Sequence, residues 1–195
     1  MSEEQSGHVD LAVQMYEIQV DTALKAGVNL SLRTLQIFGD INEDMLSRLD
    51  TCLGLLEVEP ERKATIRIHS EGGSVTEALA MVSRIRNSPL VIDVEVHGIA
   101  YSAAIMLLAA GTGERRMSRL GWAMHHEGSY GVEGTHTVIR HVVKQAEREE
   151  QAWCVAMSEL TKAPADFWRK KGRLGLDLYL TAQECLELGV CDKLF

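Results

Sequence analysis

The feature that most constrains the fold is a regular alternation of strand-like and helix-like segments between residues 35 and 96. Residues 35–38, 64–68 and 91–96 are short segments whose apolar side chains suit β-strands. Between them, residues 42–57 and 74–87 repeat their apolar side chains at helical spacing. Strands that alternate with helices through short connections form βαβ units with parallel pairing. The sequence therefore predicts an α/β fold built on a largely parallel sheet.

Further elements are expected along the rest of the chain. Asn42 is suited to cap the first predicted helix, and Thr181 followed by Glu184 forms the capping-box pattern of another helix start. The remaining expected segments are a helix or docking arm over residues 11–26, helices over 102–111, 135–160, 164–172 and 181–188, and a strand over 122–126.

Length, charge and cysteine content narrow the class of protein. A chain of 195 residues suits one domain with a sizeable core. The net charge of −8 disfavours a nucleic-acid binder, which needs a basic surface. No stretch approaches about 20 apolar residues, so no membrane span is expected. The polar, acidic start lacks the features of a secretory signal, and the four cysteines suit free thiols in a reducing compartment. We therefore expect a cytoplasmic protein.

Three places in the sequence could carry chemistry. Ser102 lies at a strand-to-helix junction, where free backbone N–H groups favour an anion, although it could equally be a simple N-cap. Gly72 and Gly73 follow a strand directly, as in a tight turn or a close approach to a ligand. His125 and His126 end another strand and offer a general base. Neighbouring strand residues point to opposite faces, which argues against one metal ion held by both.

Taken together, these motifs resemble those of the proteolytic subunit of the Clp protease family. The matching segments, covering roughly residues 33–195, are Gly-Gly-Ser-Val at 72–75, Gly-Ile-Ala-Tyr-Ser-Ala-Ala at 98–104, Leu-Leu-Ala-Ala-Gly at 107–111, Met-His-His-Glu at 124–127 and Asp-Leu-Tyr-Leu-Thr-Ala-Gln-Glu at 177–184. The resemblance implies a crotonase/ClpP-like α/β fold of repeated ββα units with a protruding handle helix. It also implies a peptidase domain at residues 31–195 behind a divergent N-terminal segment at residues 1–30.

The resemblance further implies a serine endopeptidase that cleaves unfolded or partly folded polypeptides inside an oligomeric ring chamber. By residue-by-residue matching, Ser102 is the nucleophile, His126 the general base and Asp177 the acid that orients it, with His125 as the fallback base. Gly73 and Ala103 match the oxyanion hole, and no cofactor or metal is implied. Substrate is expected to bind as an extended strand between residues 72–75 and roughly 128–134.

The resemblance also implies partners, but this chain departs from the family there. Family subunits form heptameric rings that stack and dock a Clp ATPase in apolar pockets. The matching positions here are polar, namely Thr65, Arg67, Asn87, Glu95 and His97. We therefore expect a homo-oligomer whose dependence on a Clp ATPase is open. Two alternatives share the fold: a non-catalytic ring subunit, and a crotonase-type enzyme acting on acyl-CoA thioesters. A complete set of matches to the triad argues against both.

Overall fold

The computed structural model describes residue 25 and residues 27–58, 61–172 and 175–195. The helix expected over residues 11–26 lies almost entirely outside the described residues. The domain boundary expected at residue 30 stays a prediction.

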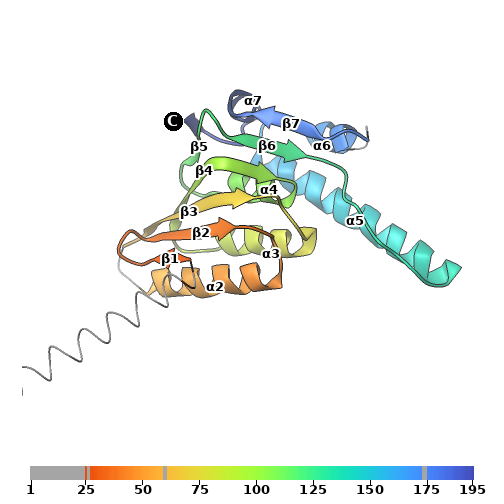
Figure 1. Cartoon of the computed structure of the whole chain (residues 1–195), viewed down its shortest axis with the longest axis horizontal. Helices are drawn as coiled ribbons and strands as arrows, with labels where there is room; N and C mark the ends of the chain where they lie inside the picture. Colours follow the sequence, from red (N-terminus) through yellow and green to blue (C-terminus); the bar gives the residue numbers. More distant parts are fainter. Residues whose placement is uncertain (1–24, 26, 59–60, 173–174) are drawn as a thin grey trace, which may run out of the picture.

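The predicted strand–helix alternation is confirmed as the first half of the fold. It comprises β2 (Thr34–Phe38), α2 (Glu43–Glu57), β3 (Lys63–Ser70), α3 (Val75–Arg86) and β4 (Val91–Tyr101). Asn42 caps α2 by accepting a hydrogen bond from the Met45 N–H, as its position predicts. Strands β2, β3 and β4 pair in parallel, and α2 and α3 pack together on one face of the sheet (Figure 1).

Strand β4 is longer than the expected segment because it pairs with two successive strands along the same edge. Its first half is parallel to β5 (Arg115–Met117), and its last residues are parallel to β6 (Trp122–His125). Strand β6 also pairs antiparallel with β7 (Leu178–Thr181), and β5 pairs with β8 (Lys193–Leu194). Strand β1 (Val28–Asn29) pairs antiparallel with β2. We did not predict β1, β5, β7 and β8, which are short.

The remaining helices follow the expected segments closely. They are α4 (Ala103–Ala109), α5 (His136–Leu160), α6 (Ala165–Gly172) and α7 (Ala182–Glu187). Thr181 and Glu184 form the predicted capping box of α7. Helix α4 is fully buried in the core, whereas the first half of α5 projects away from the body of the molecule (Figure 1). All four cysteines are buried, and none of them is in a disulfide bond.

Candidate active site

Ser102 occupies the sharp turn between β4 and α4. Its backbone has φ 51° and ψ −123°, a conformation that non-glycine residues rarely adopt. The expected helix included Ser102, but α4 begins at Ala103, and this turn is the reason. Strained residues of this kind concentrate at functional sites, and an exposed serine on a strained strand-to-helix turn is the arrangement of hydrolase nucleophiles.

The Gly72–Gly73 loop lies directly beside this turn and depends on both glycines. A Cβ added to Gly72 would lie 2.6 Å from the Ser102 Cβ, and one added to Gly73 would lie 2.3 Å from the Ile41 carbonyl oxygen. Both residues also have positive φ, at 103° and 147°. Ser70 holds the loop in place, because its Oγ accepts a hydrogen bond from the Gly72 N–H and donates one to the Gly39 carbonyl.

Backbone N–H groups of this loop and of α4 face the same region. The Ile41 N–H donates to the Gly72 carbonyl and the Ser74 N–H donates to the Ile41 carbonyl, so the intervening Gly73 N–H points away from Ile41. Ala103 is the first residue of α4, a position whose N–H has no acceptor within the helix. Gly73 and Ala103 each line a hollow that also contains Ser102.

Strand pairing brings His126 to Ser102 across 24 residues of sequence. Tyr101 lies opposite Met124 in the β4–β6 pair, and the Ser102 N–H donates to the Met124 carbonyl at 2.8 Å. His126 follows the last residue of β6, and its Nε2 lies 2.8 Å from the Ser102 Oγ. With a neutral imidazole, the Ser102 hydroxyl can donate to this nitrogen, which is the contact that a nucleophile and its base require.

Asp177 approaches the other side of the same imidazole. It immediately precedes β7, whose first residue, Leu178, lies opposite His125 in the β6–β7 pair. The distance between Asp177 Oδ1 and His126 Nδ1 is 4.0 Å, which is longer than a hydrogen bond. The Tyr179 hydroxyl donates to Asp177 Oδ2 at 3.4 Å. The structure therefore brings Ser102, His126 and Asp177 together, while their catalytic roles stay a prediction.

His125 points to the opposite face of β6, as strand alternation predicts, and lies in an aromatic cluster. Its ring stacks on Trp153 of α5 with centroids 4.4 Å apart and an interplanar angle of 8°. Its Nε2 lies 2.8 Å from the Trp168 carbonyl of α6. Burial lowers the pKa of His125, which leaves the imidazole neutral at pH 7. Of the two neighbouring histidines, His126 has the contact with Ser102.

Two hollows meet at Ser102. The wider one runs between the Gly73–Thr76 segment and the Gly128–Tyr130 segment, the two sides expected to hold an extended substrate. The narrower one is bounded by His125, Trp153 and Trp168, with Glu150 in its wall. We did not predict from the sequence that these tryptophans and Glu150 would line a hollow. The helical spacing of Glu150, Trp153 and Cys154 could have indicated that they share one face of α5.

In the described part of the chain, no group of three or more His, Cys, Asp or Glu side chains is placed to hold a metal ion. None of the helices in these described ranges combines the length and the apolar composition that crossing a membrane would require.

Comparison with known proteins gives a consistent result. The family model described as Clp protease matches residues 22–195. Subunit 2 of the ATP-dependent Clp protease proteolytic component from Thermobifida fusca is 32% identical over 155 residues, covering 78% of this chain and 75% of that protein. The corresponding subunit 2 proteins of Corynebacterium diphtheriae and Mycolicibacterium paratuberculosis are each 30% identical, covering 86% and 85% of this chain and 88% and 83% of theirs.

Proposed function

The chain belongs to the Clp protease family, and on this premise we propose that it is a serine endopeptidase in which Ser102, His126 and Asp177 form the catalytic triad. Family membership and the α/β fold of the Clp type, both expected from the sequence, are confirmed. The contact of 2.8 Å between Ser102 Oγ and His126 Nε2, at a strained backbone position, carries the proposal.

The proposed reaction is acyl transfer from a peptide to Ser102 and then to water. The Ser102 Oγ attacks the peptide carbonyl carbon while its proton passes to His126 Nε2. His126 then gives this proton to the leaving amine, and the acyl-serine ester remains. Water attacks the ester with His126 again accepting the proton, and the carboxylic acid is released with Ser102 restored.

Two further elements support these steps. The N–H groups of Gly73 and Ala103 would hold the oxyanion of each tetrahedral intermediate, and one such donor contributes about 2.7–4 kcal/mol in other enzymes. Asp177 would hold the orientation of the His126 ring and stabilise its protonated form. Its separation of 4.0 Å would shorten with substrate bound, because catalytic contacts are often long in the free enzyme.

Labelling with a fluorophosphonate tests the nucleophile directly. We expect one label on the wild-type chain, measured by intact mass, and none on Ser102→Ala. Ser83→Ala is the matched control, because Ser83 is an exposed serine on α3 away from the site, and it should be labelled like wild type. Equal labelling of the wild-type chain and Ser102→Ala would exclude Ser102 as the nucleophile.

We also propose that the protein acts in the cytoplasm as a homo-oligomer of one or two rings. Support comes from α5, whose projecting half carries the exposed apolar residues Val138, Ile139 and Val143. Exposed apolar side chains gathered along one helix are typical of interaction sites. Mass in native solution tests this: the wild-type chain should be a multimer, and Ile139→Asp combined with Val143→Asp should shift it toward smaller species.

Dependence on a Clp ATPase is the point where we propose a difference from the family. The positions matched to the apolar docking pocket carry Arg67 and Glu95, which are paired with each other. An apolar docking segment would gain little burial there, whereas a large apolar side chain contributes about 1.5–3 kcal/mol when fully buried. We expect that adding a Clp ATPase with ATP leaves the rate of casein degradation unchanged. Clear acceleration would contradict this proposal.

A further inference from the structure

The side chains proposed as base and acid lie just beyond the end of the β6–β7 ladder. The last pair of this antiparallel ladder is His125 opposite Leu178. Continuing the register by one residue puts His126 opposite Asp177. Backbone pairing of the two strands therefore stops one residue short of the proposed base and acid, and structure opens most easily at such ends. Something other than the ladder has to hold these two side chains in place.

The buried ring of His125 packs against two helices directly beside this end of the ladder. It stacks on Trp153 of α5, with centroids 4.4 Å apart, and it lies edge-on to Trp168 of α6 at a centroid distance of 5.4 Å. A Cβ added to Gly172, the last residue of α6, would lie 3.1 Å from His125 Nε2, so the helix end approaches the ring closely. The last pair of the ladder is thus held by both α5 and α6.

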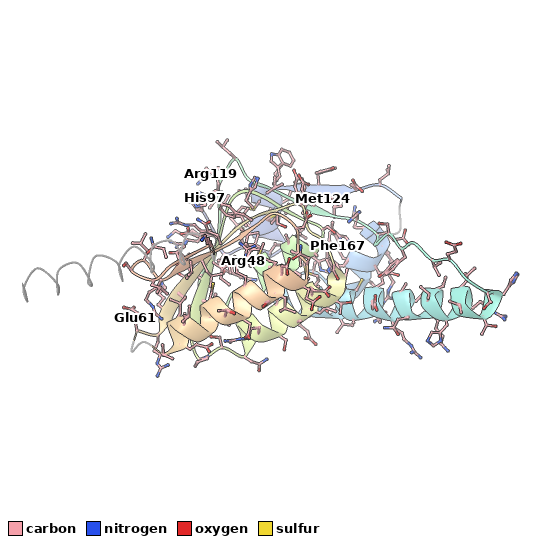
Figure 2. All side chains as sticks on the ribbon, turned by 60° about the horizontal axis from the view of Figure 1, so that its bottom comes forward. Arg48, Glu61, His97, Arg119, Met124 and Phe167 are labelled. Atoms are coloured by element: carbon pink, nitrogen blue, oxygen red, sulfur yellow. The ribbon has the colours of Figure 1, made fainter. Side chains whose placement is uncertain are left out.

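One hydrogen bond sets the orientation of the His125 ring. Burial lowers the pKa of His125, so the ring is neutral at pH 7 and has a single N–H. Its Nε2 lies 2.8 Å from the Trp168 carbonyl, and because a carbonyl only accepts, Nε2 carries the proton and donates it. Figure 2 labels Met124 and Phe167, which directly precede these two residues on β6 and α6. A hydrogen bond constrains direction as well as distance, so this contact ties β6 to α6 in one arrangement.

We propose that His125 is a positioning residue for the catalytic base and acid, an inference that rests on the proposed peptidase function. By tying the last pair of the ladder to α5 and α6, it holds His126 in contact with Ser102 and keeps Asp177 opposite. Neighbouring strand residues point to opposite faces, so a ring fixed against the helices directs the next side chain into the cleft. A displacement of about 1 Å in a catalytic group can lower a rate by about 100-fold.

His125→Phe in the full-length chain tests this with a fluorogenic peptide substrate. The variant loses the N–H donor but keeps an aromatic ring that can stack on Trp153. We expect kcat to fall about tenfold and KM to change by less than about twofold, because the arrangement of the reacting groups changes more than peptide binding does. A kcat equal to that of wild type would overturn the proposal. A loss as large as that of His126→Ala would also overturn it, because His125 would then act as the base.

His125→Gln tests whether the hydrogen bond to α6 is the contact that matters. A glutamine side chain can place an amide N–H near the position of the imidazole Nε2, and so it can donate to the Trp168 carbonyl without a ring. We expect its kcat to lie closer to that of wild type than the kcat of His125→Phe does. If His125→Gln folds and is as slow as His125→Phe, the proposed contact is not the positioning one and the proposal is overturned.

Leu53→Ala is the matched control for a general loss of stability. Leu53 is fully buried on α2 and lies outside both hollows at Ser102. The two variants are compared at a temperature where circular dichroism shows both to be folded. Leu53→Ala should unfold at a lower urea concentration than wild type and keep the wild-type kcat and KM. An equal fall of kcat in Leu53→Ala and His125→Phe would reflect stability alone and would overturn the proposal.

The rate of fluorophosphonate labelling separates failure of this inference from failure of the proposed function. The probe reports the reactivity of Ser102 toward its base without a bound peptide. We expect His125→Phe to be labelled more slowly than wild type, and Leu53→Ala to be labelled at the wild-type rate. Equal rates for wild type and His125→Phe overturn the inference while the nucleophile stands. If Ser102 of the wild-type chain is not labelled at all, the proposed function falls, and this inference falls with it.

Discussion

The polar side chains at two ends of the same sheet differ in how they are paired. At the end where β4 meets α4, the Ser102 backbone is strained and the Ser102 Oγ lies 2.8 Å from His126 Nε2. The exposed Asp177 lies 4.0 Å from the other ring nitrogen of His126. Toward the other end, Lys63, Arg67, Asp93, Glu95 and Arg116 form a set of ion pairs across β3, β4 and β5, which we call the charge ladder. In Figure 2, the labels of His97, which contacts Glu95 of the ladder, and of Arg119 lie at one side of the molecule, well apart from that of Phe167 on α6.

The ladder satisfies its charges within the chain. Arg67, Glu95 and Arg116 lie opposite one another in register, and the two Glu95 oxygens are 3.0 Å from Arg67 Nε and 2.5 Å from an Arg116 nitrogen. Such cross-strand pairs stabilise a sheet. The site instead keeps donors and acceptors directed into a cleft. We therefore expect substitutions at the site to alter activity more than stability, and substitutions in the ladder to alter stability more than activity.

The largest expected effect is that of His126→Ala on turnover. Removing the base of a triad lowers kcat by about 10⁴-fold or more in related chemistry. Because His126 is about a third exposed, the free energy of unfolding should change by less than about 0.5 kcal/mol. Peptide hydrolysis and urea unfolding measure the two quantities.

His125→Ala is the partner experiment at the adjacent residue. It removes a ring that is 5% exposed and stacked on Trp153, so it should lower the free energy of unfolding by about 2–4 kcal/mol. At a temperature where this variant is folded, it should retain far more turnover than His126→Ala. The reverse ranking of turnover would make His125 the base.

Gly73→Ala should lower kcat/KM by about 100-fold, because its Cβ would lie 2.3 Å from the Ile41 carbonyl oxygen and force the proposed oxyanion donor to move. Gly39→Ala is the control: Gly39 also has positive φ, at 89°, but a Cβ there meets nothing within 4 Å. The control should cost about 1 kcal/mol of stability from backbone strain and leave activity intact. Similar losses of activity in both variants would argue against a local role for Gly73.

Glu95→Gln, in the ladder, should lower stability rather than activity. Glu95 is 13% exposed, and its removal leaves Arg67 and Arg116 without their shared carboxylate. We expect a loss of about 1–3 kcal/mol in the free energy of unfolding, with kcat/KM unchanged. Unfolding in urea and hydrolysis of a leucine peptide measure these, and a loss of activity without a loss of stability would contradict the comparison.

The stability that Glu95 contributes should also depend on pH, and the pKa of Glu95 gives the direction of this dependence. Burial acts to raise the pKa of Glu95, but the Arg67 hydrogen bond and the Arg116 charge outweigh it and hold the pKa below its ordinary value of 4.5. The folded state therefore gains stability from Glu95 above pH 4.5, and this gain disappears as pH falls through the lower folded pKa. The stability gap between wild type and Glu95→Gln should be constant from pH 7 to 5 and shrink toward pH 3.

The smallest effect is expected for Arg67→Met. The Arg67 side chain is 42% exposed, and Glu95 keeps its contact with Arg116 when Arg67 is removed. A partly exposed pair contributes about 0.2–1 kcal/mol, so the variant should lose no more than that, and less at high salt. Urea unfolding at low and high salt measures it. A larger loss than that of Glu95→Gln would show that the ladder depends on its outer member.

The elements that the sequence predicted share a strong local pattern. The helices predicted over residues 42–57 and 135–160 end within one residue of the observed ends of α2 and α5. The two predicted caps, Asn42 of α2 and Thr181 of α7, are also observed. Strands β1, β5, β7 and β8 have two to four residues each and too little periodicity to be recognised. They exist because a neighbouring strand supplies their hydrogen bonds, which no local pattern reveals.

Local spacing and residue type were enough to predict the order of strands and helices, the glycines that the Gly72–Gly73 loop needs, and the family to which the chain belongs. Tertiary packing was needed to establish that His126 rather than His125 contacts Ser102, that Asp177 lies 4.0 Å from His126, and that Glu150 lines the narrow hollow beside Ser102. Those relations depend on strand register and on the packing of α5 and α6 against β6, which bring together residues far apart along the chain.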